Sequence, residues 1–158
     1  MTTNSLADAL EREHHEIDDG IEAFTAAQVI GERETVMLLG AIAALRRHIY
    51  LEEEFVFPPM RTGGMVAPLF VMVREHAQLW ATLDVLESEL SSNADAGVLR
   101  KRCDELMAGL QQHNPKEEQV IYPQADVSLS AEAISHLTDF MASGQLPDGW
   151  VCEGNRKG

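Results

Sequence analysis

The sequence predicts an all-α fold, an up-down-up-down four-helix bundle with a short additional C-terminal helix. Two observations predict it. Apolar residues recur at steps of three and four along four segments, which is the spacing of one face of a helix. Stretches rich in Gly, Pro or Ser separate these segments, and short connections between long helices favour antiparallel neighbours.

The first helix follows a capping residue, Asn4 or Ser5, whose side chain can accept a hydrogen bond from a free N–H at the helix start. Gly31 interrupts the pattern, so we expect the first turn between helices there. The apolar face of this helix consists of Leu6, Leu10, His14, Ile17, Ile21 and Phe24.

We expect Pro58-Pro59 and Gly63-Gly64 to separate the second helix from the third. Its apolar face consists of Leu38, Ala41, Leu45, His48, Glu52 and Phe55. The third helix shows the same spacing in Val73, His76, Trp80 and Leu83.

The fourth helix follows Ser91-Ser92-Asn93, which separates it from the third and offers a cap, and Pro123 is expected to end it. A shorter fifth helix is predicted from about Ala131 to Ser143, stopping at Gly144. The tail that follows lacks periodicity and predicts irregular structure. The apolar face of the fourth helix consists of Leu99, Cys103, Leu106, Leu110, His113, Glu117 and Val120.

The composition bounds the class of protein. A chain of 158 residues with 45% hydrophobic and 24% charged residues predicts one ordinary globular domain. The net charge of −14 argues against nucleic acid and anionic membrane surfaces as partners, because both require clusters of Lys and Arg. Two cysteines provide no disulfide framework. No signal peptide is apparent and the apolar runs are too short to span a membrane, so we expect a cytoplasmic protein.

A repeated motif carries the chemistry. The stretch from His48 to Pro58 recurs almost intact from His113 to Pro123. Both copies begin with His, place Glu at the fourth and fifth positions after it, and run through apolar residues into Pro. Since residues four apart lie on one face of a helix, each His can point the same way as its Glu.

A shorter repeat precedes each copy, because Arg12-Glu13-His14 recurs as Arg74-Glu75-His76. The chain therefore consists of two helix pairs, each contributing a lone His and a His-x3-Glu. Every one of these His lies on an apolar face, where a polar group is costly unless something satisfies it. We predict that six residues converge in the bundle centre as metal ligands: His14, His48, Glu52, His76, His113 and Glu117.

Imidazole and carboxylate ligands suit iron, manganese or zinc. Six ligands are too many for one tetrahedral zinc, but they suit two metals bridged by Glu52 and Glu117. We assign His14 and His48 to one metal, and the remaining two His to the other. A single His on an apolar face is more often a hydrogen-bonded core residue, but four within a repeat favour a metal site.

These motifs resemble those of the hemerythrin-like, or HHE cation-binding, family of four-helix di-iron proteins. The resemblance covers about residues 5–124 and implies two non-haem, carboxylate-bridged iron ions. It also implies a di-iron bundle over residues 1–125, with a C-terminal helix and irregular tail over 126–158. The motifs are Glu13-His14-x-x-Ile17, His48-x3-Glu52-Glu53, Glu75-His76-x-x-Leu79, and His113-x3-Glu117-Glu118 followed by Tyr122-Pro123.

The sequence departs from the oxygen-carrying hemerythrins. Those proteins have a fifth His where this chain has Trp80, and an Asp one residue further along in place of Glu117. The four-His, two-Glu set is similar to that of bacterial proteins that repair iron centres after oxidative and nitrosative stress. The resemblance implies reaction with dioxygen, nitric oxide or peroxide, or supply of iron to iron-accepting proteins. A protein that binds or senses oxygen reversibly, without turnover, is the alternative.

Some residues near the motifs have two interpretations. His15 adjoins His14 but lies off the apolar face, so His14 is favoured as the ligand. Glu53 and Glu118 lie about 100° around the helix from the ligand Glu, and we expect them to face solvent or to orient a His N–H. Tyr50 and Tyr122 can approach a metal, although packing is the favoured role.

Other residues are assigned less chemistry. Trp80 is expected to pack in the core, and it can also fill the space of the missing His. Pro115 removes a backbone hydrogen bond from the fourth helix and is expected to kink it. His136 is expected at the surface, and Cys152 is expected to be an exposed tail cysteine.

Overall fold

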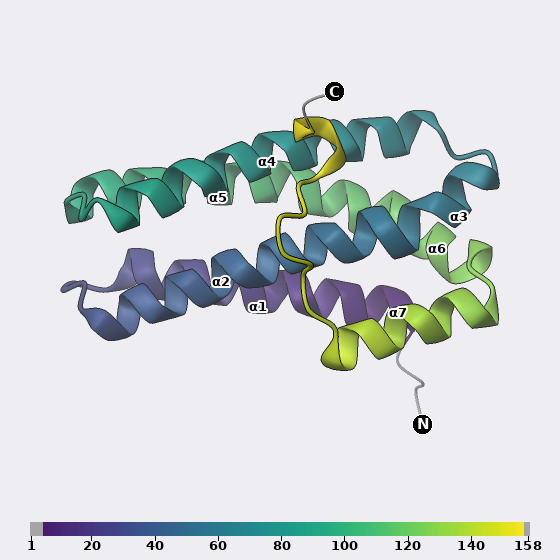
Figure 1. The fold of residues 1–158 in the computed structure, drawn as a ribbon, viewed down its shortest axis with the longest axis horizontal. Coiled ribbons are helices and arrows are strands. Elements are labelled where there is room, and N and C mark those ends of the chain that lie inside the picture. The colour runs from purple at the N-terminus through teal and green to yellow at the C-terminus, as the bar shows by residue number, and fades with distance from the viewer. Residues whose placement is uncertain (1–4, 157–158) are drawn as a thin grey trace.

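Four long helices form the body of the molecule, and the computed structural model describes residues 5–156 of the chain. They are α1 (Leu6–Ala26), α2 (Glu32–Leu51), α4 (Ala67–Ser91) and α5 (Ala96–Lys116). Helix α1 packs beside α2, and α4 beside α5, with both short loops at the same end of the bundle (Figure 1). The described residues contain no strand. The predicted all-α bundle is therefore confirmed.

The helix starts follow their capping residues. Ser5 caps α1, because its Oγ accepts from the Asp8 N–H at 3.1 Å while the Asp8 carboxylate accepts from the Ser5 N–H. The other predicted cap, Asn4, lies outside the described residues. Helix α5 is capped by Asp95, whose Oδ1 accepts from the Val98 N–H at 2.9 Å. The cap expected within Ser91-Ser92-Asn93 is therefore wrong by two residues, although these residues do separate α4 from α5.

The prediction that Pro123 ends the fourth helix is wrong, and of the residues expected to separate the second and third helices, Gly63-Gly64 do so but Pro58-Pro59 do not. Helix α2 continues through a π-helical segment, η1 (Glu52–Val56), into α3 (Phe57–Thr62). Helix α5 continues in the same way through η2 (Glu117–Ile121) into α6 (Tyr122–Ser128). Each of these prolines lies in the first turn of the new α-helical segment, where its missing N–H costs little. The first break after α2 comes at Gly63-Gly64, where Gly64 has a φ of 103°.

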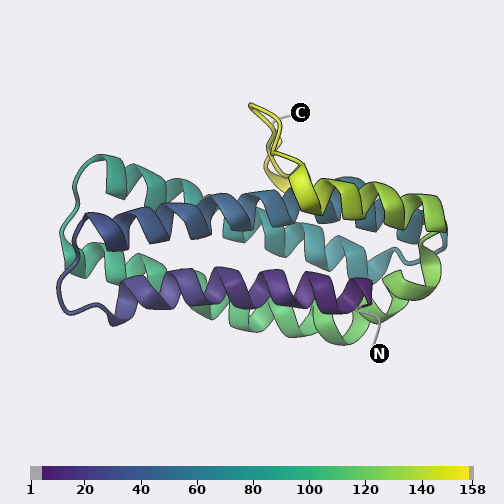
Figure 2. The same ribbon diagram turned by 90° about the horizontal axis from the view of Figure 1, so that it is seen from below.

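Helix α7 (Ala131–Ser143) is the predicted C-terminal helix. It lies along the outside of the bundle beside α2 (Figure 2). Arg47 of α2 holds its end, because the guanidinium donates to the carbonyls of Phe140, Met141 and Gly144 at 2.6–2.9 Å. The division of the chain at residue 125 stays a prediction.

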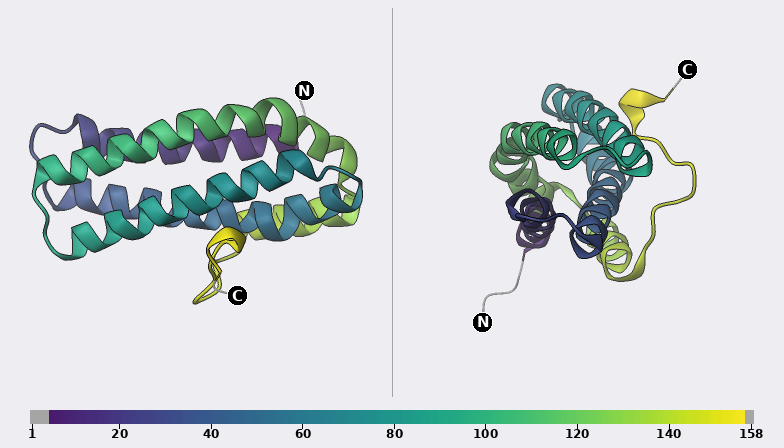
Figure 3. Two further views of the ribbon diagram at one scale, coloured as in Figure 1. Left: turned by 90° about the horizontal axis from the view of Figure 1, so that it is seen from above. Right: turned by 90° about the vertical axis from the view of Figure 1, so that its left-hand side faces the viewer.

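The C-terminal tail packs against the bundle. After α7 it crosses the outside of α2 and reaches α4, where it forms the short turn η3 (Glu153–Asn155) (Figures 1 and 3). Trp150 and Val151 pack against the core and Cys152 is fully buried, so the expectation of an exposed Cys152 is wrong. Burial raises the pKa of the Cys152 thiol to about 11.

The apolar core is divided into two clusters along the bundle. One cluster lies toward the short loops and includes Ile17 and Leu79. The other lies toward α3 and α6 and includes Leu10 and Val73. His14 stands between Leu10 and Ile17, and His76 stands between Val73 and Leu79, so the histidines form a polar layer between the clusters. In the described part of the chain, no helix is both long enough and apolar enough to cross a membrane.

Gly20 marks the closest approach of α1 to α2. A Cβ at Gly20 would lie 2.9 Å from the Cβ of Ala41, whereas a Cβ at Gly40 would meet nothing within 4 Å. We predict that Gly40→Ala raises the free energy of unfolding by about 0.5–1 kcal/mol, because Gly weakens a helix interior. Gly20→Ala should lower it, because overpacking costs about 1–3 kcal/mol. Urea denaturation measures both, and equal stabilisation by the two changes would show that this contact does not limit the packing of α1.

Candidate metal centre

The polar layer contains all six predicted ligands, each at most 3% exposed. They form two groups whose ligand atoms lie within 4.8 Å of one another. The first group holds His14 and His48, the second holds His76 and His113, and Glu52 and Glu117 belong to both. This is the grouping expected from the sequence. The role of the six residues as metal ligands stays a prediction.

The four imidazoles turn the same atom toward the centre. Nε2 of His14 and Nε2 of His113 lie 3.2 and 3.1 Å from Oε1 of Glu117. Nε2 of His48 and Nε2 of His76 lie 3.5 and 3.3 Å from Oε1 of Glu52. The two carboxylates therefore lie between the two His pairs, as bridging ligands must.

A second set of carboxylates holds the outer side of each imidazole. Because a carboxylate only accepts, each Nδ1 donates, which leaves the Nε2 lone pair free to face the centre. The pairs are His14 with Glu118 at 3.0 Å, His48 with Glu13 at 2.8 Å, His76 with Glu53 at 2.7 Å, and His113 with Glu75 at 2.9 Å.

Each of these orienting carboxylates is the chain neighbour of a ligand and binds a His on another helix. Glu13, for example, precedes His14 on α1 but binds His48 on α2. Two interpretations were open for Glu53 and Glu118, and both side chains orient a His. Exposure to solvent is wrong for Glu53, which is only 7% exposed. Sequence reasoning assigned no role to Glu13 and Glu75, although their repeated Glu-His dipeptide was a usable signal.

The π-helical segments begin at the two central carboxylates. Glu52 opens η1 and Glu117 opens η2, and the carbonyl of each accepts from the fifth residue after it. Within η1 the consecutive residues Glu52 and Glu53 are both buried. An α-helix would separate their directions by about 100°. Adjacent positions thus supply a proposed ligand and an orienting group in η1, as they do in the α-helical pairs Glu13-His14 and Glu75-His76.

One carboxylate contact extends beyond the bundle. The outer oxygen of Glu53, Oε1, accepts from the backbone N–H of Glu153 at 2.8 Å, while its Oε2 holds His76. The C-terminal tail therefore fixes the orientation of a residue of the polar layer.

The charges of the metal-free layer depend on one another. Burial raises the pKa of Glu117, but the positive charge of His113 and the hydrogen bonds from the surrounding His hold it well below its ordinary value. Burial and the charge of Glu117 raise the pKa of Glu52. Burial lowers the pKa of His14, but its hydrogen bond to Glu117 and the charge of that group raise it to about 9. His14 and Glu117 thus stabilise each other's charged forms.

Three buried atoms test whether a cation fits. No hydrogen-bond partner is present for Oε1 of Glu52, Nε2 of His76 or Oε2 of Glu117. The His76 nitrogen lies 3.3 Å from the Glu52 oxygen and 3.5 Å from the Glu117 oxygen. An unsatisfied buried polar atom costs about 1–3 kcal/mol. When His76 is neutral with its proton on Nδ1, each of the three atoms has a lone pair to donate to a cation, so the residues present fit a metal ion in this half of the layer.

In the half of the layer that contains His14 and His48, the Tyr122 hydroxyl provides the inward-facing atoms with a hydrogen-bond partner. The Tyr122 hydroxyl donates to Oε2 of Glu52 at 2.8 Å and lies 2.9 Å from Nε2 of His14 and 3.0 Å from Nε2 of His48. Burial and the charges of Glu117 and Glu52 raise the pKa of Tyr122 well above its ordinary value. Tyr122 therefore does more than pack in the apolar core, because its hydroxyl belongs to the polar layer.

The remaining residues near the motifs have structural roles. Trp80 is buried against Trp150, and the guanidinium of Arg46 lies 4.4 Å from its ring centre. Tyr50 packs among Phe55, Phe140 and Trp150. His15 and His136 are exposed, so His14 is the residue that enters the layer. Helix α5 continues through Pro115 to its end at Lys116.

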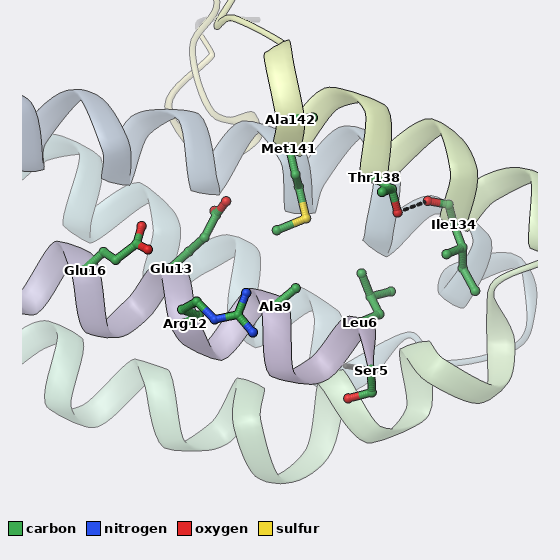
Figure 4. Close-up of a pocket in the computed structure, with 10 residues that line it drawn as sticks. All are labelled: Ser5, Leu6, Ala9, Arg12, Glu13, Glu16, Ile134, Thr138, Met141 and Ala142. Carbon is green, nitrogen blue, oxygen red and sulfur yellow. Dashed lines mark hydrogen bonds between the residues drawn. The ribbon is translucent and has the colours of Figure 1, made fainter. Parts of the chain in front are cut away.

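A pocket of about 480 Å³ lies between α1 and α7 (Figure 4). Arg12, Glu13 and Glu16 line its α1 side, and Thr138 and Met141 line its α7 side. The Glu13 carboxylate reaches from this pocket to Nδ1 of His48 at 2.8 Å. The side chain of Glu13 therefore connects the pocket to the polar layer.

Comparison with protein families decides the class of this site. The hemerythrin HHE cation-binding domain matches residues 5–125. The chain belongs to the hemerythrin HHE family. No curated protein and no solved structure matched the chain in the corresponding comparisons. The protein is a hemerythrin-like metal-binding domain, and the two His/Glu groups of its polar layer are able to hold metal.

If Glu52 and Glu117 bridge two metals in this hemerythrin-like domain, changing either one to Ala should remove metal from both positions. The measurement is metal content per chain by elemental analysis after anaerobic Fe(II) loading, with circular dichroism to verify folding. The exposed His136 provides the control, and His136→Ala should cost no metal. Equal loss from all three variants would contradict the assignment of the bridges.

The metal-free protein should lose stability as the pH rises from about 6.5 to about 9. The folded-state pKa of His14 is about 9, against 6.5 ordinarily, and the pKa values of His76 and His113 are also raised. A raised folded-state pKa contributes stability that is complete below the unfolded-state pKa and lost as the pH rises through the folded-state value. The melting temperature should therefore be lower at about pH 9.5 than at about pH 6. Metal-loaded protein is the control, and an equal change in both forms would contradict this origin.

Proposed function

We propose that this protein binds two iron ions, one between His14 and His48 and the other between His76 and His113. The observation that carries the proposal is that Glu52 and Glu117 belong to both groups of ligand atoms. Imidazole and carboxylate donors together suit iron. When bound, an iron pair supplies reversible one-electron redox chemistry and coordination positions for small ligands.

The burial of the layer limits the size of the reactant. Every proposed ligand is at most 3% exposed, and apolar clusters lie on both sides. A bulky substrate cannot reach these atoms in this structure, whereas a diatomic molecule or peroxide requires little space. We therefore propose that the reactants are dioxygen, nitric oxide or peroxide, in an oxidative or nitrosative stress response.

Supply of iron to damaged centres is the second part of the proposed stress role. Glu13 and Glu16 line the pocket between α1 and α7, and Glu13 also holds His48. Carboxylates suit a path for a departing cation, so this pocket is the side on which we expect an iron-accepting protein to approach.

The alternative function is reversible binding or sensing of oxygen without turnover. The apolar clusters that flank the layer favour it, because they exclude water from a bound ligand. The two functions differ in outcome, since one consumes the small molecule or gives up iron and the other returns the oxygen.

The experiment begins with anaerobic Fe(II) loading and elemental analysis, where about two irons per chain are expected for a dinuclear site. Loaded protein is then mixed with dioxygen, nitric oxide or peroxide, and separately with an acceptor protein that lacks its iron–sulfur cluster. Consumption of an oxidant or transfer of iron supports the stress role, whereas an absorption spectrum that reverses on cycling the oxygen pressure supports the alternative. One zinc or no metal after loading, with no reactivity, would overturn both.

A further inference from the structure

The two halves of the layer differ at one position of the repeat. In the first copy, Phe57 precedes Pro58, and in the second, Tyr122 precedes Pro123. Both residues open an α-helical segment directly after a π-helical segment, and both are fully buried. The ring is thus in the same place in each half, but only one ring carries an oxygen.

In the half without the oxygen, the ring packs flat on a proposed ligand. Phe57 stacks on His76, with ring centroids 5.6 Å apart and planes 15° apart. Three of the buried atoms without a hydrogen-bond partner belong to residues of this half: Oε1 of Glu52, Nε2 of His76 and Oε2 of Glu117.

In the other half, the Tyr122 oxygen lies among all four proposed ligands. It is 2.9 Å from Nε2 of His14, 3.0 Å from Nε2 of His48, 2.8 Å from Oε2 of Glu52 and 3.3 Å from Oε1 of Glu117. Bonds from a first-row metal to such donors are about 2.0–2.2 Å long. A cation held by these four residues must therefore lie beside the phenol oxygen.

The ring has little freedom to withdraw. Tyr122 is among the largest fully buried side chains and packs in an apolar cluster with Leu10, Phe57 and Ala125. Forcing such a ring into occupied space costs about 1–3 kcal/mol. We therefore expect the Tyr122 oxygen to stay next to the cation, because moving the ring away would be costly.

We propose that Tyr122 is a further iron ligand, on the His14–His48 half only, so that the two iron positions are chemically different. This inference rests on the proposed binding of two irons. On coordination the Tyr122 O–H bond breaks, an oxygen–metal bond forms and the proton passes to solvent, with no change of oxidation state. The phenolate then supplies a seventh protein ligand to a pair that the six His and Glu ligands alone would hold symmetrically.

The test is the visible absorption and resonance Raman spectrum of protein loaded with iron and oxidised to Fe(III). A phenolate bound to Fe(III) gives a charge-transfer band in the visible region, and excitation in that band enhances the ring vibrations of the phenolate. We expect the wild type to show both signals. Tyr122→Phe should keep two irons, since the six other ligands remain, and should lose both signals.

Two further variants sharpen the test. Phe57→Tyr places a phenol in the corresponding position of the other half, and it should increase the intensity of the band about twofold if each half then has one phenolate. Tyr50→Phe is the matched control, because Tyr50 packs in an aromatic cluster outside the layer, and it should leave the spectrum unchanged.

Loaded protein with two irons but without phenolate signals, or signals that persist in Tyr122→Phe, would overturn the ligand assignment and leave the proposed binding of iron intact. Failure of the wild type to bind iron would overturn both.

Discussion

Two buried carboxylates, Glu52 and Glu117, impose the constraint on which the rest of this bundle depends. An unpaired carboxylate is very costly to bury, so positive charge must surround both side chains. Four inward-facing imidazoles surround the two carboxylates, and four outer carboxylates hold those imidazoles in place. The apolar clusters on either side then pack against a layer whose geometry is already fixed.

The orienting carboxylates also link the two helix pairs. Glu13 and Glu75 bind a His within their own pair, but Glu118 binds His14 and Glu53 binds a His on α4. Each pair therefore depends on the other for the orientation of one imidazole. Since removing one partner of a buried charged pair is costly, the layer favours a single arrangement of the four helices.

The sequence predicted the helices and the grouping of His and Glu because both follow from local spacing. Helical periodicity places His48 and Glu52 on one face, and the repeat places their counterparts on another. The failures come from interactions between distant segments. The π turns that carry the chain past Pro58 and Pro123, and the burial of Cys152 under the tail, depend on packing that no local pattern encodes. The sequence left two roles open for Tyr122, because an aromatic residue on an apolar face has the same pattern whether or not its hydroxyl makes polar contacts.

The contact between the C-terminal tail and Glu53 makes the tail part of the structure that supports the polar layer. The family match ends at residue 125, yet the N–H that anchors the Glu53 carboxylate comes from Glu153. This N–H therefore lies outside the residues that match the family. The bundle and the C-terminal tail are thus joined at the atoms that orient His76, and mutations in the tail can alter the geometry of the polar layer without changing any of residues 5–125.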